Sequence, residues 1–246
     1  MKEYSYIGKG KVYLAKREDN KLRYVGNCDK VELSISEETK ELKDFANSGG
    51  GVVNSVSRVD KLEIALNLFD YSPANLAMAL YGEASTVEAG KAVTEEHVAY
   101  RNHLVKLQHS HIKHVTVKST KADIIFQQGT DYDVVSAGII ILESSKIKDG
   151  EKLLIDYEYS GSDIIHALVN SGYEYHLVFD GLNEAQSGKK VVLDLYRVKF
   201  TPASSLSLIG DDFASLELKG TALVDTSKVG TGISRYFKVE MEQLNA

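Results

Sequence analysis

The chain has 246 residues, of which 43% are hydrophobic and 26% charged, and only two are prolines, so we expect an ordered globular protein with a substantial core. No apolar run approaches the roughly 18 residues of a membrane span, and the first residues lack the apolar stretch of a secretory signal. The net charge of −6 disfavours binding to nucleic-acid phosphates, and the lone Cys28 excludes an internal disulfide.

Two short strands are predicted first. KVYLAKRE (11–18) and KVELSIS (30–36) alternate between apolar and polar residues, and the stretch between them contains the turn residues Gly26 and Asn27. Alternation with a period of two places one face of each strand on a core and leaves the other face polar.

A long segment without periodicity follows, from about Ser36 to Ser57. It contains three consecutive glycines and several apolar residues. A loop longer than about 15 residues is uncommon in a compact domain and is usually functional or disordered. Apolar side chains on such a loop favour burial against another protein chain. We therefore predict an assembly loop whose inter-subunit contact residues are Phe45, Gly49, Gly50, Gly51, Val52 and Val53.

The loop leads into a long strand and one short helix. In Arg58–Asp70 apolar residues recur at every second position from Leu62, so one face should lie on the core. Ser72 is predicted as the N-cap of the helix, Pro73 as its first residue and Gly82 as its stop. The residues expected to pack this helix on the core are Leu76, Ala77, Leu80 and Tyr81.

Residues 84–164 have a pattern of their own, in which short strands are separated by turns. The predicted strands are 114–119, 122–127, 131–136, 138–142 and 151–160, with turn signals such as Gln128-Gly129 and Asp149-Gly150 between them. We predict a small β-module inserted into a core domain formed by residues 1–83 and 165–246. Exposed linkers are expected around Glu83–Lys91 and Gly161–Asp163. The alternative is that these strands complete the main sheets.

Four further strands are predicted in the C-terminal part, at 173–183, 190–200, 213–225 and 234–241. Residues 204–212 fit either a short helix or a loop. The fold class that follows is mainly β, with two packed antiparallel sheets forming a sandwich or barrel and one short α-helix.

The histidines and glycine-rich stretches give no strong indication of a metal or phosphate site. His109 and His111 would share one face if they lay on a strand, as a metal pair requires. His114 has the opposite parity, and no carboxylate or cysteine lies close in sequence, so exposed or core histidines are the better interpretation. Gly8–Lys11 lacks the spacing of a phosphate-binding loop and precedes a strand.

The order of a loop with three glycines, an alternating strand and a helix ending in NLAMALYG resembles the major tail tube proteins of long-tailed bacteriophages, which are related to the inner tubes of contractile injection systems. The opening GKGKVYLAKREDNKLRYVGNCDKVELSIS is similar as well. The resemblance covers residues 5–82 and, more loosely, 170–240. TDYDVVSAGIIILESSKIKDGEKLLIDYEYSG resembles a β-module of phage structural proteins, in which the strand at 132–134 pairs with the one at 139–141.

The resemblance implies a structural virion protein and not an enzyme. Its subunits would form hexameric rings that stack into a hollow tail tube, and edge strands would pair with those of neighbouring subunits. DNA would pass through the tube without specific binding. The implied partners are further copies of the chain, a tape-measure protein, and the tail-tip initiator and tail terminator proteins, with no cofactor and no membrane. Assembly would take place in the host cytoplasm and the product would belong to the virion tail.

Two other classes stay open. A β-rich adhesin or receptor-binding module would be expected to present aromatic residues to its ligand. A β-sandwich hydrolase would need paired acids, and Asp131/Asp133 and Asp156/Glu158 each share a strand face. Acids on a strand face normally form its solvated side, so the hydrolase is the less favoured of the two.

Overall fold

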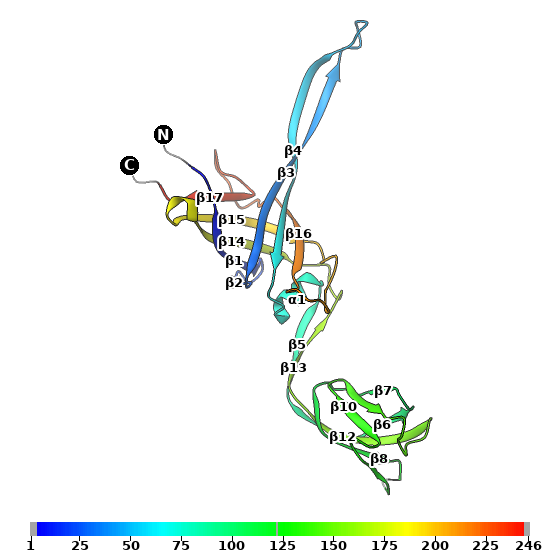
Figure 1. Cartoon of the computed structure of the whole chain (residues 1–246). Helices are drawn as coiled ribbons and strands as arrows, with labels where there is room; N and C mark the ends of the chain where they lie inside the picture. The colour runs from blue at the N-terminus through cyan, green and yellow to red at the C-terminus, as the bar shows by residue number, and fades with distance from the viewer. Residues whose placement is uncertain (1–3, 122, 244–246) are drawn as a thin grey trace. The chain divides into compact units, whose positions relative to one another are not determined.

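The computed structural model describes residues 4–121 and 123–243, which are mainly β with one short α-helix, as predicted (Figure 1). The chain divides into two compact units. Unit 1 comprises the residues up to Glu83 and from Ile165 onward, and unit 2 comprises Ala84–Ile164. These divisions fall at the residues where the sequence pattern changes.

Unit 1 is built on an eight-stranded sheet, in the order β2-β1-β14-β15-β16-β4-β3, with β17 also paired to β15. The pairs that form it are antiparallel. Its strands are β1 (Gly8–Lys16), β2 (Arg23–Tyr24), β3 (Cys28–Lys43), β4 (Val52–Leu68), β14 (Glu174–Asn183), β15 (Lys189–Phe200), β16 (Leu216–Ala222) and β17 (Phe237–Met241).

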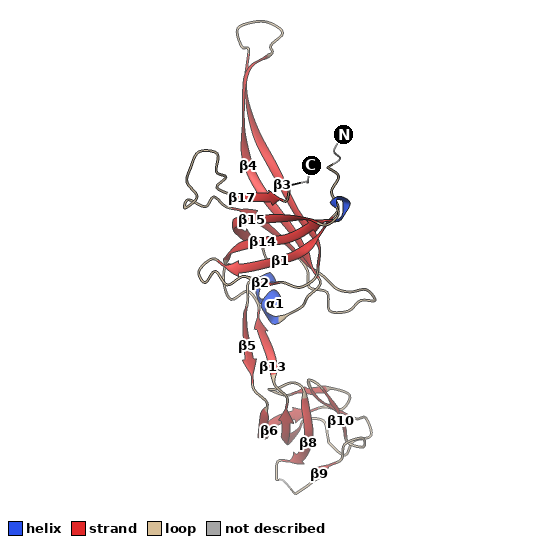
Figure 2. Cartoon of the chain, turned by 90° about the vertical axis from the view of Figure 1, so that its left-hand side faces the viewer, coloured by secondary structure: helices blue, strands red, loops and turns tan. Residues whose placement is uncertain are grey.

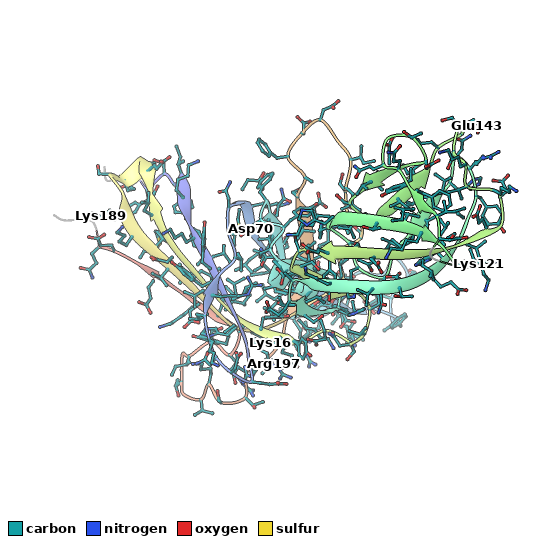
Figure 3. The ribbon with its side chains drawn as sticks, turned by 90° about the horizontal axis from the view of Figure 1, so that it is seen from below. Lys16, Asp70, Lys121, Glu143, Lys189 and Arg197 are labelled. Atoms are coloured by element: carbon teal, nitrogen blue, oxygen red, sulfur yellow. The ribbon has the colours of Figure 1, made fainter. Side chains whose placement is uncertain are left out.

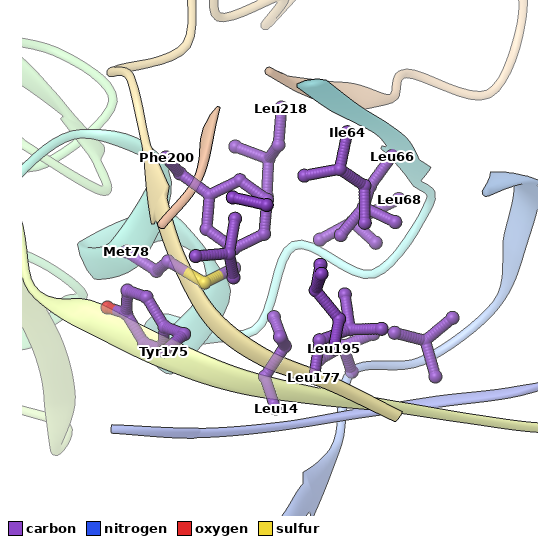
Figure 4. Close-up of a cluster of buried hydrophobic side chains, with 14 of the residues drawn as sticks. Leu14, Ile64, Leu66, Leu68, Met78, Tyr175, Leu177, Leu195, Phe200 and Leu218 are labelled. Atoms are coloured by element: carbon purple, nitrogen blue, oxygen red, sulfur yellow. The ribbon is translucent and has the colours of Figure 1, made fainter. Parts of the chain in front are cut away.

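The core of unit 1 lies between parts of this one sheet. Buried side chains such as Leu14, Leu177 and Leu195 come from β1, β14 and β15, and they meet Ile64 and Leu218 from β4 and β16 (Figure 4). The two predicted layers are thus joined into a single hydrogen-bonded sheet, because β15 pairs with β14 along one edge and with both β17 and β16 along the other.

Ion pairs reinforce the strands of unit 1. Arg197 of β15, labelled in Figure 3, donates from Nε and Nη2 to the Glu174 carboxylate, each over 2.7 Å. Arg17 donates to both carboxylate oxygens of Asp225, at 3.0 and 3.2 Å. Two-pronged guanidinium–carboxylate contacts of this kind orient both partners as well as attract them.

The β3–β4 hairpin corrects one prediction. The loop expected from about Ser36 to Ser57 is a strand through Lys43 and again from Val52, with only residues 44–51 between the two. Its pairing runs as far as Lys43↔Val52. These residues show no apolar alternation, because both faces of this strand pair are exposed and neither packs on a core.

Helix α1 (Pro73–Ala79) begins at Pro73 as predicted, but Ser72 caps it only through its backbone. The Ser72 carbonyl accepts from the Leu76 N–H over 2.9 Å, and its side chain makes no cap hydrogen bond. The helix is held instead by Asn75, which is fully buried. Its amide donates to the carbonyls of Val25 and Asp70, each over 2.8 Å, and accepts from Arg23 over 2.7 Å.

The buried face of α1 differs from the predicted one. Asn75, Met78 and Ala79 are buried, whereas the predicted stripe is only partly buried, although Leu76 still packs against the core. The members of that stripe are Leu76, Ala77, Leu80 and Tyr81. The buried face of α1 is rotated by about one residue relative to the predicted face. The reason is that Asn75, a polar residue that a hydrophobic pattern counts as exposed, anchors the helix.

The end of α1 also differs from the prediction. The residue with left-handed backbone is Tyr81, at φ 50°, and not Gly82. Gly82 N–H donates to the Ala77 carbonyl and Tyr81 N–H to the Met78 carbonyl, the paired bonds of a Schellman motif. Gly82 is required for a different reason: a Cβ there would lie 2.5 Å from the backbone oxygen of His166. The Tyr81 hydroxyl donates to the Phe200 carbonyl.

Unit 2 has its own core between two small sheets, labelled in part in Figure 2. The Tyr-Asp-Val strand pairs with the isoleucine-rich strand as predicted, with Tyr132 opposite Ile141 and Val134 opposite Ile139. Of the strand expected at 122–127, residue 122 lies outside the described residues. The order is β6-β12-β8-β9 in one sheet and β10-β11-β7 in the other, formed by β6 (Gly90–Ala99), β7 (Leu104–Lys106), β8 (Ile112–Ser119), β9 (Ile125–Phe126), β10 (Tyr132–Val135), β11 (Gly138–Ile141) and β12 (Glu151–Tyr159).

The two passages of the chain between the units are mostly exposed, as predicted, and both contain strands. β5 (Glu83–Val87) and β13 (Ser162–His166) form a two-stranded sheet. Thr86 donates from its hydroxyl to Asp163 over 2.9 Å. The sequence predicted the exposure of these residues but not their pairing as strands.

Candidate assembly interface

The β3–β4 hairpin has two parts, which we call the root and the arm. The root (28–35 and 61–68) belongs to the core of unit 1, and its residues Leu62, Ile64, Leu66 and Leu68 are at most 4% exposed. The arm (36–60) extends beyond that core, and all of its residues except Asp44 are exposed. The part of the hairpin without a covering partner is therefore the part that carries the predicted contact residues.

A β-bulge separates root from arm. Ser36 is opposite Lys61 and Glu37 is opposite Val59, so Asp60 is the extra residue of the bulged strand. Directly opposed side chains lie on the same face of an antiparallel pair. The bulge therefore brings Val59 to the face that continues the buried face of the root.

The pairing assigns the remaining arm residues to two faces. The core-side face continues from Glu37 and Val59 to Thr39 and Ser57, whose hydroxyl oxygens are 2.8 Å apart. The outer face carries the opposed pairs Glu38/Arg58, Lys40/Val56 and Leu42/Asn54. Glu38 and Lys40 lie 3.6 Å apart on it, as an exposed ion pair.

Apolar side chains are exposed on both faces and at the tip. Phe45 is 87% exposed, and Val52 and Val53, which begin β4, are also exposed. Four further exposed apolar residues were not among the predicted contacts. Leu42 and Val56 lie in the segment predicted as a loop, whereas Ile35 and Val59 lie in the predicted strands on either side of it. A two-stranded ribbon is marginally stable in water when no third element covers it, so this surface is suited to another chain.

The tip of the arm (44–51) is organised by Asp44. Its carboxylate accepts from the Ala46 N–H over 2.8 Å and from the Asn47 side-chain amide over 2.7 Å, and these bonds hold the pKa of Asp44 below its usual range. Gly49 has φ 114°, which strongly favours glycine, and Gly50 has φ 40°. Turn geometry thus explains Gly49 and Gly50, while the predicted role of the three glycines as contact residues stays a prediction.

The sheet of unit 1 also has open edges. Within the part of the chain that the structure describes, β3 pairs only with β4, so its second edge carries unpaired backbone groups. At the other end, β2 covers β1 only at Tyr13 and Leu14. Exposed edges of this kind are templates for strands of another chain.

His109 and His114 of the histidine cluster contact aromatic or acidic side chains. His109 and His111 precede β8, so the strand geometry on which a metal pair would depend is not present at these two residues. The His109 ring stacks on Tyr159 at 3.8 Å between centroids, and His114 lies 2.9 Å from Glu158. No group of three metal-ligating residues occurs among residues 4–121 and 123–243.

The acid pairs are engaged in structural contacts. Asp131 is buried and not solvated as expected, and it accepts from the Gln127 and Lys146 N–H groups, each over 2.9 Å. Burial raises its pKa, but these hydrogen bonds outweigh burial and hold the pKa below the usual range. Asp133 is exposed.

The second acid pair is bound to cations. Asp156 accepts from Lys118 over 2.5 Å. Contacts with Lys91 and His114 lower the pKa of Glu158 to about 2.

Cys28 is half-buried, and burial, with a smaller effect of Asp29, raises the pKa of its thiol to about 11. At neutral pH this cysteine is therefore a thiol and not the nucleophilic thiolate.

Comparison with known protein families assigns the chain to one of them. A family model described as protein of unknown function UCP028589 matches residues 5–240, and the chain therefore belongs to that family. No curated protein matches the chain. No helix in the described ranges is long and apolar enough to span a membrane.

Proposed function

We propose that this protein is the structural subunit of a bacteriophage tail tube, in which copies form rings of six that stack into a hollow conduit for DNA. The observation that carries the proposal is the arm. It places exposed apolar residues on both faces of a ribbon that no other described part of the chain covers. The ring of six and the stacked tube in this proposal rest on the resemblance of residues 5–82 to tail tube proteins.

The open edges of the sheet support lateral assembly. The uncovered edge of β3 and the largely uncovered edge of β1 lie at opposite ends of the strand order. One edge of each copy can therefore pair with a different edge of its neighbour, which is a head-to-tail contact that closes into a ring. Pairing in the ring would remove both edges.

The charge of the chain fits a conduit. A net charge of −6 per copy favours a surface that does not hold DNA phosphates. Acidic groups that face the lumen would repel phosphates over a Debye length of about 8 Å at physiological salt. The proposal includes a tape-measure protein inside the tube, the initiator and terminator proteins at its ends, and a location in the virion tail.

Electron microscopy of the purified full chain, before and after concentration, tests the proposal. Rings or tubes of uniform width are expected. A chain that stays monomeric at every concentration, with no ring or tube, would contradict it.

A variant in which a Gly/Ser linker replaces residues 40–54 tests the arm. It should keep the melting temperature and circular dichroism of the wild type, since the core of unit 1 lies elsewhere, and it should form no tubes. A matched pair within the arm refines the test. Phe45→Ser with Val53→Ser should weaken assembly, while the polar exchange Asn54→Ser should leave it unchanged. Normal tubes from the linker variant would show that the arm makes no necessary contact.

A further inference from the structure

A second exposed apolar segment of unit 1 lies between β15 and β16. Residues 204–212, which fit either a helix or a loop, form a loop. We call residues 206–213 the acceptor loop. Ile209 is 97% exposed, Phe213 93% and Leu208 79%. Between them stand two exposed acids, Asp211 and Asp212.

The ends of this loop are fixed although its middle is exposed. The Tyr71 hydroxyl lies 3.4 Å from the Ser207 carbonyl and 3.3 Å from that of Ser215. The Ala203 N–H donates to the Ala79 carbonyl at the end of α1 over 2.7 Å. A loop that is held at both ends while it presents apolar side chains to solvent is suited to receive another surface.

The acceptor loop and the arm lie at opposite ends of one strand. β16 starts at Leu216, which is opposite Leu68, the last residue of β4, whereas the arm includes the first residues of β4 from Val52 (Figures 1 and 2). The 17 residues of β4 span about 55 Å at the usual rise of a strand. Copies displaced along β4 therefore bring the arm of one to the acceptor loop of the next.

The outer face of the arm has the complementary chemistry. It contains a hollow of about 310 Å³ lined by Glu38, Lys40, Val56 and Arg58. An apolar side chain, two cations and one anion line this hollow, so its charge is net positive. The acceptor loop offers apolar side chains on either side of two carboxylates.

We propose that the acceptor loop of one copy docks into the hollow on the outer face of the arm of a copy in the adjacent ring. Ile209 or Phe213 contacts Val56, and Asp211 and Asp212 pair with Lys40 and Arg58. The contact joins two different surfaces of copies displaced along β4, and a heterologous contact between displaced copies repeats as an open stack when no rotation closes it into a ring. This inference rests on the proposed function and adds to it the partner surface of the arm.

Charge reversal in the full chain tests the contact. Lys40→Glu with Arg58→Glu, and separately Asp211→Lys with Asp212→Lys, should each raise the protein concentration needed for tube formation by about tenfold or more, because attractions become repulsions. The four substitutions together should restore assembly to near the wild-type concentration. All of these side chains are exposed, so melting temperatures should not change. Tube formation is measured by pelleting and microscopy.

A control variant makes the same change in charge elsewhere as Asp211→Lys with Asp212→Lys does in the acceptor loop. Glu88→Lys with Asp133→Lys alters exposed residues of unit 2 and should assemble as the wild type does. If either reversed pair forms tubes at the wild-type concentration, or if the combined variant fails to recover, the docking inference is wrong while the tail tube proposal stands. If the wild type forms neither rings nor tubes, the proposed function itself fails.

Discussion

The root and the arm of the β3–β4 hairpin share one antiparallel ladder, yet their surroundings differ completely. In the root, every second residue of β4 is buried in the core of unit 1, namely Leu62, Ile64, Leu66 and Leu68. In the arm the same two strands continue with nearly every residue exposed. Backbone pairing needs only a partner strand, whereas burial needs a third element. The comparison teaches that a strand pair can form fully in this hairpin where no described part of the chain covers it.

The largest difference is expected from matched truncations in the two parts. Leu66→Ala in the root removes a side chain that is 2% exposed and should lower the free energy of unfolding by about 2–5 kcal/mol. Val56→Ala in the arm should change it by less than about 0.5 kcal/mol in the monomer. Urea denaturation measures both. Equal losses would show that the arm is packed in the free subunit, which would break the comparison.

Buried and exposed amides give a second contrast. Asn75→Ala removes the side chain that satisfies the carbonyls of Val25 and Asp70 beside the root, and it should cost about 2 kcal/mol or more. Asn54→Ala on the exposed arm should cost less than about 0.5 kcal/mol. The melting temperatures of the two variants, measured side by side, test this, and a drop with Asn54→Ala as large as that with Asn75→Ala would contradict it.

A pH series sharpens the contrast between buried and exposed charge. The Arg17 guanidinium beside Asp225, with help from Ser227, holds the pKa of that carboxyl well below its usual range. The pKa is lower in the folded state, so the ion pair stabilises the fold at pH values above about 4 and this contribution is lost as the pH falls further. Asp225→Asn should cost about 1–2 kcal/mol at pH 7 and less at pH 3, because Arg17 is partly exposed.

The exposed arm supplies the control for this series. Glu38→Gln should leave the pH dependence of unfolding close to that of the wild type, since Glu38 is 59% exposed in its ion pair. Denaturation at several pH values measures both variants. An Asp225→Asn variant whose loss of stability is the same at pH 3 and pH 7 would show that the lost interaction is not ionic.

The smallest effect is expected within the arm itself. Thr39→Val removes the contact between the hydroxyls of Thr39 and Ser57, which are 2.8 Å apart. Cross-strand pairs of this kind contribute about 0.2–1 kcal/mol, so amide exchange in the arm should accelerate about twofold while that in the root stays unchanged. Hydrogen exchange read by mass spectrometry would detect it. Faster exchange in the root would show that the two parts open together.

Several elements could be predicted because their signals are local. The alternation in Arg58–Asp70, the Pro73 helix start and the pairing of Tyr132–Val134 with Ile139–Ile141 all hold in the structure. The arm was missed as a strand pair because neither of its faces is buried, so the alternation that reveals strands is absent. Its exposed apolar residues Phe45, Val52 and Val53 were nevertheless recognisable, since hydrophobic character is a property of single residues.

The buried polar groups show where prediction from sequence stops. In the sequence Asn75 and Asp131 look like exposed polar residues, yet both are buried, because backbone groups distant in the sequence form hydrogen bonds with them. Their partners Val25 and Lys146 are set by tertiary contacts, and a pattern along the chain contains no information on them.

By itself, then, the sequence determined the mainly β class, the positions of most strands and turns, and the exposure-prone apolar residues of the arm. These depend on neighbouring residues and on the alternation that one buried face imposes. Only the tertiary structure decided that the arm is a two-stranded ribbon, that a bulge at Asp60 brings Val59 to the core-side face, and that the acceptor loop lies at the far end of β4. Register, burial and the placement of loops arise from residues far apart in the chain, so no local pattern could contain them.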